Sequence, residues 1–173
     1  MKIRNILLTL SFLAISANAA NDYLKQESYW DIQSISNPVI DPTGGMVIFS
    51  KKYIDKQNDS FISDLWVMDS DGSDKRFFVK GSRPQWSPDG KKVAFPTNSG
   101  DHSFIGVYHF SSHQIVYLSP SVDRDNSPVW SSNSKEIAFL RIPNEKNVLP
   151  FEERRAGLPW SIYIGNAVTG NAK

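Results

Sequence analysis

Cysteine is absent from the 173 residues. This absence excludes a disulfide framework and thiolate metal sites, but it does not identify a cellular compartment. A strong charge of either sign is also missing, because 19 basic residues face 18 acidic residues and the formal net charge is +1. Bulk electrostatics therefore gives no reason to expect a nucleic-acid partner. Beyond the N-terminus, no apolar run approaches the length of about 20 residues that spans a membrane.

The first nineteen residues have the pattern of a signal peptide. Lys2 and Arg4 form a basic start, residues 6–15 are an apolar run, and Ala17-Asn18-Ala19 supplies the small residues that a signal peptidase reads. We predict cleavage after Ala19, export to the periplasm or outside the cell, and no membrane association after cleavage. The alternative is a buried N-terminal helix. No cysteine follows the cleavage site, which argues against a lipoprotein anchor.

A hairpin is predicted over residues 83–95, R-P-Q-W-S-P-D-G-K-K-V-A-F. In its turn, Pro88 fixes φ, Asp89 can bond its own backbone, and Gly90 accepts the positive φ of a tight hairpin. Residues 92–95 then alternate in a way that predicts a strand with one face in a core.

The same pattern occurs in two more places, residues 37–50 (N-P-V-I-D-P-T-G-G-M-V-I-F-S) and residues 127–140 (S-P-V-W-S-S-N-S-K-E-I-A-F-L). The aligned prolines, Pro38, Pro84 and Pro128, are 46 and 44 residues apart. The third copy lacks the proline, aspartate and glycine of the turn, so we expect Asn133 to take its left-handed conformation.

A second hairpin lies between successive copies, so each period of about 45 residues holds four strands, as in a β-propeller blade. The predicted fold is all-β: an incomplete β-propeller of about three four-stranded blades. A different all-β fold, such as an antiparallel sandwich, is the alternative. We expect a lead-in over 20–36 and a partial propeller over 37–173. Its blades cover about 37–82, 83–126 and 127–173, the last incomplete and carrying an insertion at 142–160.

Three blades are fewer than the 4–8 that close a propeller. Either other copies of the chain complete the ring, or the sequence is the N-terminal part of a longer protein. The second interpretation is favoured.

The repeats W-S-P-D-G-K-K-V-A-F and S-D-L-W-V-M-D-S-D-G resemble those of the prolyl oligopeptidase family and of TolB-like periplasmic proteins. Three features favour the dipeptidyl peptidase and acylaminoacyl peptidase branches of the peptidase family. They are the lead-in Y-W-D-I-Q-S-I-S-N-P, the stretch D-N-S-P-V-W-S-S-N-S-K-E-I-A-F-L-R, and the insertion ending in A-G-L-P-W-S-I-Y.

This resemblance implies a propeller that acts on a peptide substrate together with a C-terminal α/β-hydrolase domain carrying a Ser-Asp-His triad. The nucleophile of such a domain sits in a G-x-S-x-G turn, and no such motif occurs between Met1 and Lys173. The chain is therefore expected to hold no catalytic residues of this kind. The alternatives are a non-catalytic TolB-like binding scaffold and a degenerate product without independent function.

The insertion at 142–160 is the one segment that the repeat does not explain. In dipeptidyl peptidases a glutamate pair from a propeller insertion binds the free amine of the substrate through charge-assisted hydrogen bonds. By this resemblance, Glu152 and Glu153 are candidate amine ligands, and Arg154 or Arg155 is a candidate ligand for a substrate carbonyl. The alternative is a solvated surface loop with local ion pairs.

Other candidate sites have simpler interpretations. The acidic run at 69–74 has oxygens at alternate positions, as in calcium loops, but its place between two strands predicts a β-turn. His109 and His113 are expected in a strand and its turn, while His102 is alone in a loop, so neither a metal nor another cofactor is expected. Trp66, Trp86 and Trp130 recur at repeat positions and are predicted to pack between blades.

Overall fold

The computed structural model describes residues 26–144 and 160–173. The predicted signal peptide at 1–19 lies outside these residues, as do Glu152, Glu153, Arg154 and Arg155. The described chain begins with η1, a 3₁₀-helix over Gln26–Asp31. No helix in the described ranges has the length and apolarity needed to cross a bilayer.

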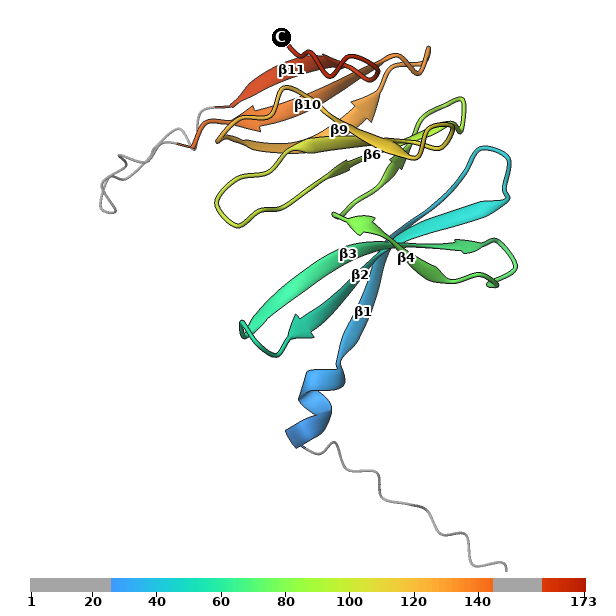
Figure 1. Cartoon of the computed structure of the whole chain (residues 1–173), viewed down its shortest axis with the longest axis vertical. Helices are drawn as coiled ribbons and strands as arrows, with labels where there is room; N and C mark the ends of the chain where they lie inside the picture. The colour runs from blue at the N-terminus through green and yellow to red at the C-terminus, as the bar shows by residue number, and fades with distance from the viewer. Residues whose placement is uncertain (1–25, 145–159) are drawn as a thin grey trace, which may run out of the picture.

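Eleven strands form three antiparallel sheets in the described residues, two of four strands and one of three (Figure 1). Each sheet is built from strands that follow one another in the chain. The all-β prediction is confirmed. The first sheet contains β1 (Gln33–Ile40), β2 (Met46–Asp55), β3 (Ser60–Asp69) and β4 (Arg76–Lys80); the second contains β5 (Gln85–Trp86), β6 (Lys92–Pro96), β7 (Ile105–His109) and β8 (Gln114–Tyr117); the third contains β9 (Arg124–Trp130), β10 (Glu136–Ile142) and β11 (Ser161–Asn166).

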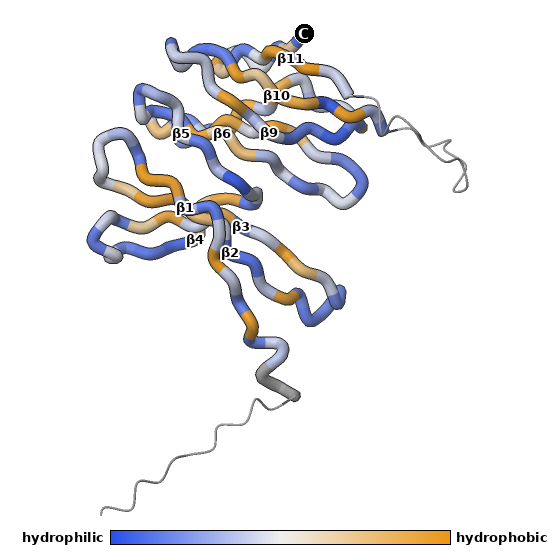
Figure 2. The backbone as a smooth tube through the Cα atoms, turned by 180° about the vertical axis from the view of Figure 1, so that it is seen from behind, coloured by the Kyte–Doolittle hydropathy of each residue, from blue (hydrophilic) through white to orange (hydrophobic). Residues whose placement is uncertain are grey.

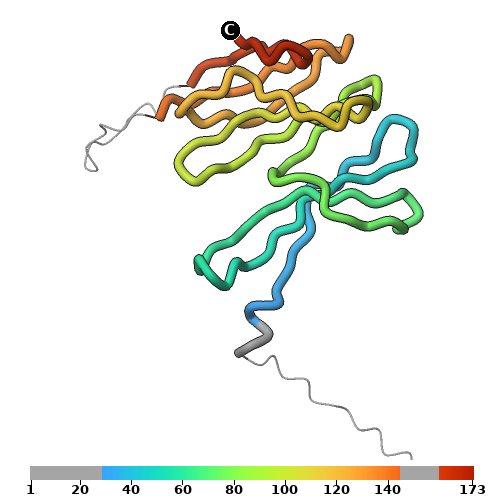
Figure 3. Tube along the Cα trace, viewed as in Figure 1, coloured from blue at the N-terminus to red at the C-terminus, as the bar shows by residue number. Residues whose placement is uncertain are grey.

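The three sheets are stacked in chain order, as the colour gradient of Figure 3 shows. In the third sheet, the last residues of the chain turn back along β11. Ile164 N donates to Lys173 O at 2.9 Å, and Lys173 N donates to Ile164 O at 3.1 Å. The last residues therefore pair with the free side of β11, where Gly165 and Ala172 form an antiparallel bridge.

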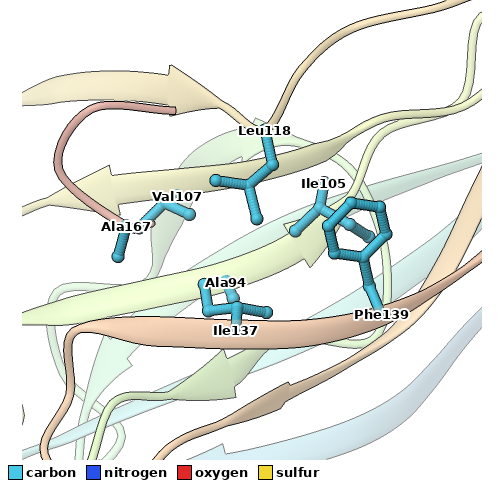
Figure 4. Close-up of a cluster of buried hydrophobic side chains, with 7 residues drawn as sticks. All are labelled: Ala94, Ile105, Val107, Leu118, Ile137, Phe139 and Ala167. Carbon is cyan, nitrogen blue, oxygen red and sulfur yellow. The ribbon is translucent and has the colours of Figure 1, made fainter. Parts of the chain in front are cut away.

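Two clusters of buried apolar side chains hold the stack together. One, between the second and third sheets, is drawn in Figure 4 and consists of Ala94, Ile105, Val107, Leu118, Ile137, Phe139 and Ala167. The other, between the first and second sheets, consists of Ile48, Leu65, Val67, Val93 and Phe95. The second sheet contributes to both clusters.

Strand β6 is buried on both faces, so the expectation of one buried face at residues 92–95 was wrong. Val93 and Phe95 belong to the cluster on one side, while Ala94 belongs to the cluster on the other. All three are fully buried. The reason is the position of β6 inside the middle sheet, which has a neighbouring sheet on each side.

The outer faces of the stack keep apolar side chains exposed. Figure 2 shows apolar stretches along the strands and polar connections between them. Ile40 in the first sheet remains 58% exposed, and in the third sheet Val129 and Ile162 remain 63% and 62% exposed. The end sheets therefore bury much less of their apolar surface than the middle sheet does.

The first turn of each sheet has one repeated hydrogen-bond geometry. The backbone N–H of Asp41, Ser87 or Ser131 donates to the carbonyl five residues later, at 2.9 Å in each case. The side chain of the same residue accepts from the backbone N–H of that later residue, at 2.7 Å for Asp41 and 2.9 Å for Ser87. The three sequence copies therefore form the same turn.

In the second turn, Asp89 is held by several donors. Partial burial acts to raise the pKa of Asp89, but hydrogen bonds from Ser87 Oγ, Lys91 N and Lys92 Nζ outweigh it and lower the pKa to about 2. In the third turn, Asn133 occupies the corresponding position, and its Oδ1 accepts from Ser131 Oγ at 2.7 Å.

The left-handed residue of this turn is Gly44, Gly90 or Ser134, with φ of 80°, 68° and 57°. The expectation that Asn133 takes this conformation was wrong by one position. Asn133 uses its side chain to cap the turn, and the next residue makes the reversal. Ser134 Oγ also accepts from Asp89 N at 3.1 Å, which joins the turns of neighbouring sheets.

A second left-handed residue precedes each aligned proline. Asn37, Arg83 and Ser127 have φ of 50°, 46° and 55°. The register of the β1–β2 and β9–β10 ladders shifts at these sites, as in a β-bulge. A following proline by itself favours extended backbone at the preceding residue, so the positive φ at these sites belongs to the bulge and not to the proline.

Two of the three tryptophans join neighbouring sheets as predicted. Trp86 Nε1 donates to Val39 O at 3.3 Å, and Trp130 Nε1 donates to Gln85 O at 3.0 Å. Trp66 differs: its indole lies under Lys51 Nζ, 4.3 Å from the ring centroid, and its Nε1 has no hydrogen-bond partner among the described residues.

The turn glycines allow a matched stability test. Both Gly44 and Gly90 have positive φ, so alanine at either site should cost about 1–2 kcal/mol of unfolding free energy. A Cβ on Gly44 meets nothing within 4 Å, whereas a Cβ on Gly90 lies 3.3 Å from Pro42 Cδ. Gly90→Ala should therefore destabilise the chain more than Gly44→Ala in urea unfolding. Equal losses would show that the contact with Pro42 is unimportant.

Candidate functional site

Three connections leave the same end of the stacked sheets. They join β2 to β3, β6 to β7 and β10 to β11, and they occupy residues 56–59, 97–104 and 143–160. Because consecutive strands are antiparallel, these connections lie opposite the hairpin turns at 41–45, 87–91 and 131–135 (Figure 1). We call this end the loop end. It is where the insertion begins and ends.

A cleft of about 330 Å³ opens at the loop end between the second and third sheets. Its lining is mainly polar and includes two arginines and a histidine, so we call it the basic cleft. The lining residues used below are Arg83, Asn98, His102, Arg124, Asp125 and Asn126.

The arginines of the basic cleft come from different sheets. Arg83 precedes β5, and its backbone N–H donates to Ser50 Oγ at 3.0 Å. Its exposed guanidinium makes no hydrogen bond or ion pair with the residues that the structure describes. Arg124 begins β9, and its Nε donates to Asp101 O at 3.1 Å.

A buried ion pair forms the floor of the cleft. Arg141 Nε and Nη2 donate to the two carboxylate oxygens of Asp125 at 2.7 and 2.8 Å, and Nη2 also donates to Ser119 O at 2.8 Å. Burial raises the pKa of Asp125, and Arg141 opposes that rise. Hydrogen bonding to Asp125 raises the pKa of Arg141. The guanidinium carbon also lies 4.6 Å from the centroid of Tyr163.

The start of the insertion is attached to the rim of the basic cleft. Asn144 N donates to Asp123 Oδ1 at 3.2 Å, and Asn144 Nδ2 donates to Asp101 O at 3.4 Å. Asp101 Oδ1 in turn lies 2.6 Å from His102 Nδ1. The connection 97–104 and the start of the connection 143–160 therefore meet beside the cleft. The second of these connections contains the candidate substrate ligands at 152–155.

A neighbouring cavity of about 460 Å³ lies at the loop end between the first and second sheets. Among its lining residues, Tyr53 donates its hydroxyl hydrogen to Asp64 Oδ2 at 2.7 Å. This hydrogen bond, with burial and the nearby carboxylate charges, raises the pKa of Tyr53 to about 12. Asp64 Oδ1 is buried and has no partner among the described residues.

The histidines considered as metal ligands are engaged elsewhere. His109 Nε2 lies 2.9 Å from Ala167 O, and His113 Nδ1 lies 2.9 Å from Tyr108 Oη. The described ranges contain no group of three histidine or acidic side chains arranged to hold a metal ion. The acidic run at 69–74 forms the predicted turn, with Gly72 N donating to Asp69 O at 2.9 Å.

Sequence reasoning missed the arginines of the basic cleft. In the sequence Arg83 is simply the first residue of the repeat motif, and Arg124 has no repeat signature. One available signal was Arg141, a single charge inside the apolar strand I-A-F-L-R-I, which indicates a buried partner. The predicted ligands at 152–155 lie outside the described residues and stay predictions.

Comparison with known proteins places these sheets in a known fold. No protein-family model matches the chain. The β-propeller domain of the trilobed protease from Pyrococcus furiosus superposes with a TM-score of 0.54 at 14% identity, over 84% of this chain and 57% of that one. The chain is part of a β-propeller. Its three sheets are therefore blades, and the resemblance found in the repeats is confirmed at the level of fold.

Other matches are peptidases and TolB proteins. Pyrococcus horikoshii acylaminoacyl peptidase superposes with a TM-score of 0.66 at 15% identity, over 81% of this chain and 24% of the peptidase. TolB from Acinetobacter baumannii gives 0.54 at 18% identity, over 79% and 31% of the two chains. A curated relative, the uncharacterized peptidase YuxL of Bacillus subtilis, is 23% identical over 111 residues.

The blades described here correspond to a small part of these proteins. The aligned residues are 61% of this chain but only 17% of YuxL, and the chain spans about a quarter of the acylaminoacyl peptidase. The matches therefore establish the propeller fold. The activity of a whole protein is a separate proposal.

The ion pair beneath the cleft gives a stability prediction. Arg141→Met should cost about 3–5 kcal/mol of unfolding free energy, because it leaves the buried carboxylate of Asp125 without a counter-charge. The double variant Arg141→Met with Asp125→Leu should recover part of that loss, since both charges are then removed. Urea unfolding of the two single variants and the double variant measures the coupling; purely additive losses would contradict it.

Proposed function

We propose that this chain is the substrate-gating propeller portion of an exported serine peptidase that hydrolyses peptides or dipeptides. The observation that carries the proposal is the shared stacking of blades with an acylaminoacyl peptidase over 81% of the chain, together with the curated peptidase relative. In this proposal an α/β-hydrolase domain outside these residues carries the serine nucleophile and performs acyl transfer. The propeller admits substrates by size and positions them.

The loop end is the side of the propeller proposed to face the substrate. It presents the basic cleft, the cavity beside Asp64 and both ends of the insertion. Glu152 and Glu153 are proposed to bind the free amine of the substrate through charge-assisted hydrogen bonds, and Arg154 or Arg155 to bind a carbonyl. The attachment of Asn144 to the cleft rim supports this placement, because it fixes where the insertion starts.

Export is proposed from the N-terminal pattern. The basic start, the apolar run and Ala17-Asn18-Ala19 direct cleavage after Ala19 and release into the periplasm or the medium. A second candidate function, a non-catalytic binding scaffold, is favoured by the similarity to TolB, which covers 79% of the chain.

The two functions predict different behaviour of the protein purified from its source cells. A peptidase should react covalently with a fluorophosphonate probe, and the labelled polypeptide should contain the sequence of residues 20–173. It should cleave short peptides and spare folded proteins, since the propeller excludes bulky substrates. N-terminal sequencing should begin at Ala20. A polypeptide containing these blades that neither reacts with the probe nor cleaves peptides would favour the scaffold.

The glutamate pair has its own test in the active protein. Glu152→Ala and Glu153→Ala should each raise the KM for substrates with a free N-terminus by about 10–100-fold, the range expected for a lost hydrogen bond to a charged group. The KM for N-acylated substrates should change little. Glu136→Ala, an exposed site in β10, is the matched control. An unchanged KM for free-amine substrates would leave the insertion as a surface loop.

A further inference from the structure

The basic cleft holds a guanidinium without a counter-charge among the described residues. Arg83 is exposed at the cleft, and its side chain makes no hydrogen bond or ion pair there with described residues. Its backbone is nevertheless fixed, because its N–H bonds to Ser50 Oγ and Pro84 follows it directly. A guanidinium presents five donors in a planar fork that matches a carboxylate.

Arg124 adds a second positive charge from the opposite blade. One of its donors, Nε, is used by Asp101 O, and its remaining N–H groups make no further hydrogen bond with the described residues. The rim carboxylate of Asp101 lies against His102. The two arginines, one just before β5 and the other at the start of β9, therefore line the same polar cleft from its two blades.

The carboxylate in the cleft wall does not cancel these charges. Asp125 is 1% exposed and is already paired through both of its oxygens with Arg141. The neutral side chains of Asn98 and Asn126 complete the polar lining without adding charge. Two further carboxylates stand at the rim, where Asp101 lies against His102 and Asp123 accepts from Asn144 N. Among the residues that line the cleft, the positive charges therefore outnumber the negative ones.

The size of the cleft limits the ligand. About 330 Å³ accommodates one carboxylate-bearing side chain or the last residue of a peptide, and it is too small for a folded domain. A planar carboxylate can accept two parallel hydrogen bonds from one guanidinium, which makes the contact both strong and directional.

We propose that the basic cleft, through Arg83 and Arg124, binds a carboxylate group of a peptide. This inference rests on the proposed function and adds to it a preference for peptides that present a carboxylate to the cleft. The carboxylate comes either from an aspartate or glutamate side chain or from the C-terminus of the peptide, and both sources present the same chemistry.

Calorimetric titration of the purified protein with three peptides distinguishes these sources. The peptides are Ac-Ala-Ala-Glu-NH2, its glutamine counterpart Ac-Ala-Ala-Gln-NH2, and Ac-Ala-Ala-Ala with a free C-terminus. The glutamate peptide, the free-terminus peptide or both should bind at least about tenfold more tightly than the glutamine peptide, as expected for a hydrogen bond to a charged group. Equal affinity of all three, or no binding of any, would overturn the proposal.

Variants then assign the binding to the cleft. Arg83→Ala and Arg124→Ala should each remove most of the preference for the carboxylate, and Arg83→Lys should restore part of it, because lysine keeps the charge but loses the fork. Arg76→Ala, an exposed site in β4, should bind as the unchanged protein does. Circular dichroism of each variant verifies folding, and Arg83→Gln or Arg124→Gln replaces the alanine variant at the same position if that variant fails to fold. A preference that survives Arg83→Ala and Arg124→Ala would contradict the assignment.

Failure of this proposal is distinguishable from failure of the proposed function. If the protein reacts with the fluorophosphonate probe but shows no carboxylate preference, the peptidase proposal stands and the proposal of a carboxylate-binding cleft is rejected. If the carboxylate preference depends on Arg83 but the protein does not react with the probe, the cleft proposal stands and the propeller is non-catalytic.

Discussion

The structure depends on the burial of side chains between successive sheets. A sheet of four short strands cannot cover its own faces, so its apolar residues are removed from water only by neighbouring sheets. Phe95 shows how closely these surfaces fit: a Cβ added to Gly81 would lie 2.6 Å from its ring, and one added to Gly106 would lie 3.1 Å from it. Full burial of a phenylalanine contributes about 1.5–3 kcal/mol. The middle blade buries apolar side chains on both of its faces, whereas each end blade buries them on one face.

The sequence predicts much of this fold because the decisive signals lie close together in the chain. The prolines, turn residues and tryptophans recur at a nearly constant period, and each acts within one hairpin or on the next blade. The features that were missed depend on contacts across blades or on which residue of a turn uses its side chain as the cap. Two-sided burial of β6 follows only from its place in the stack. Ser134 makes the third reversal because Asn133 is used to cap the turn, which the spacing alone does not reveal.

The candidate site was less predictable for the same reason. The arginines of the basic cleft come from two blades, and the floor beneath them joins Asp125 to Arg141 across the β9–β10 ladder. No single repeat contains the site. Blade boundaries carry both the packing and the recognition chemistry, so a polar group at such a boundary must be satisfied by a partner within the stack or by a ligand.

The left-handed residue before each aligned proline is one position per repeat at which the side-chain chemistry differs between the blades. Asn37, Arg83 and Ser127 share one backbone conformation although their side chains have different chemistry. The bulge and the ladder maintain that conformation, so the side chain at this position need only tolerate a positive φ, which disfavours β-branched residues. One residue per repeat can therefore change the chemistry of the surface, within the residue types that accept a positive φ, while the architecture stays intact. Each repeat thus combines a constant backbone with one side chain that differs from blade to blade.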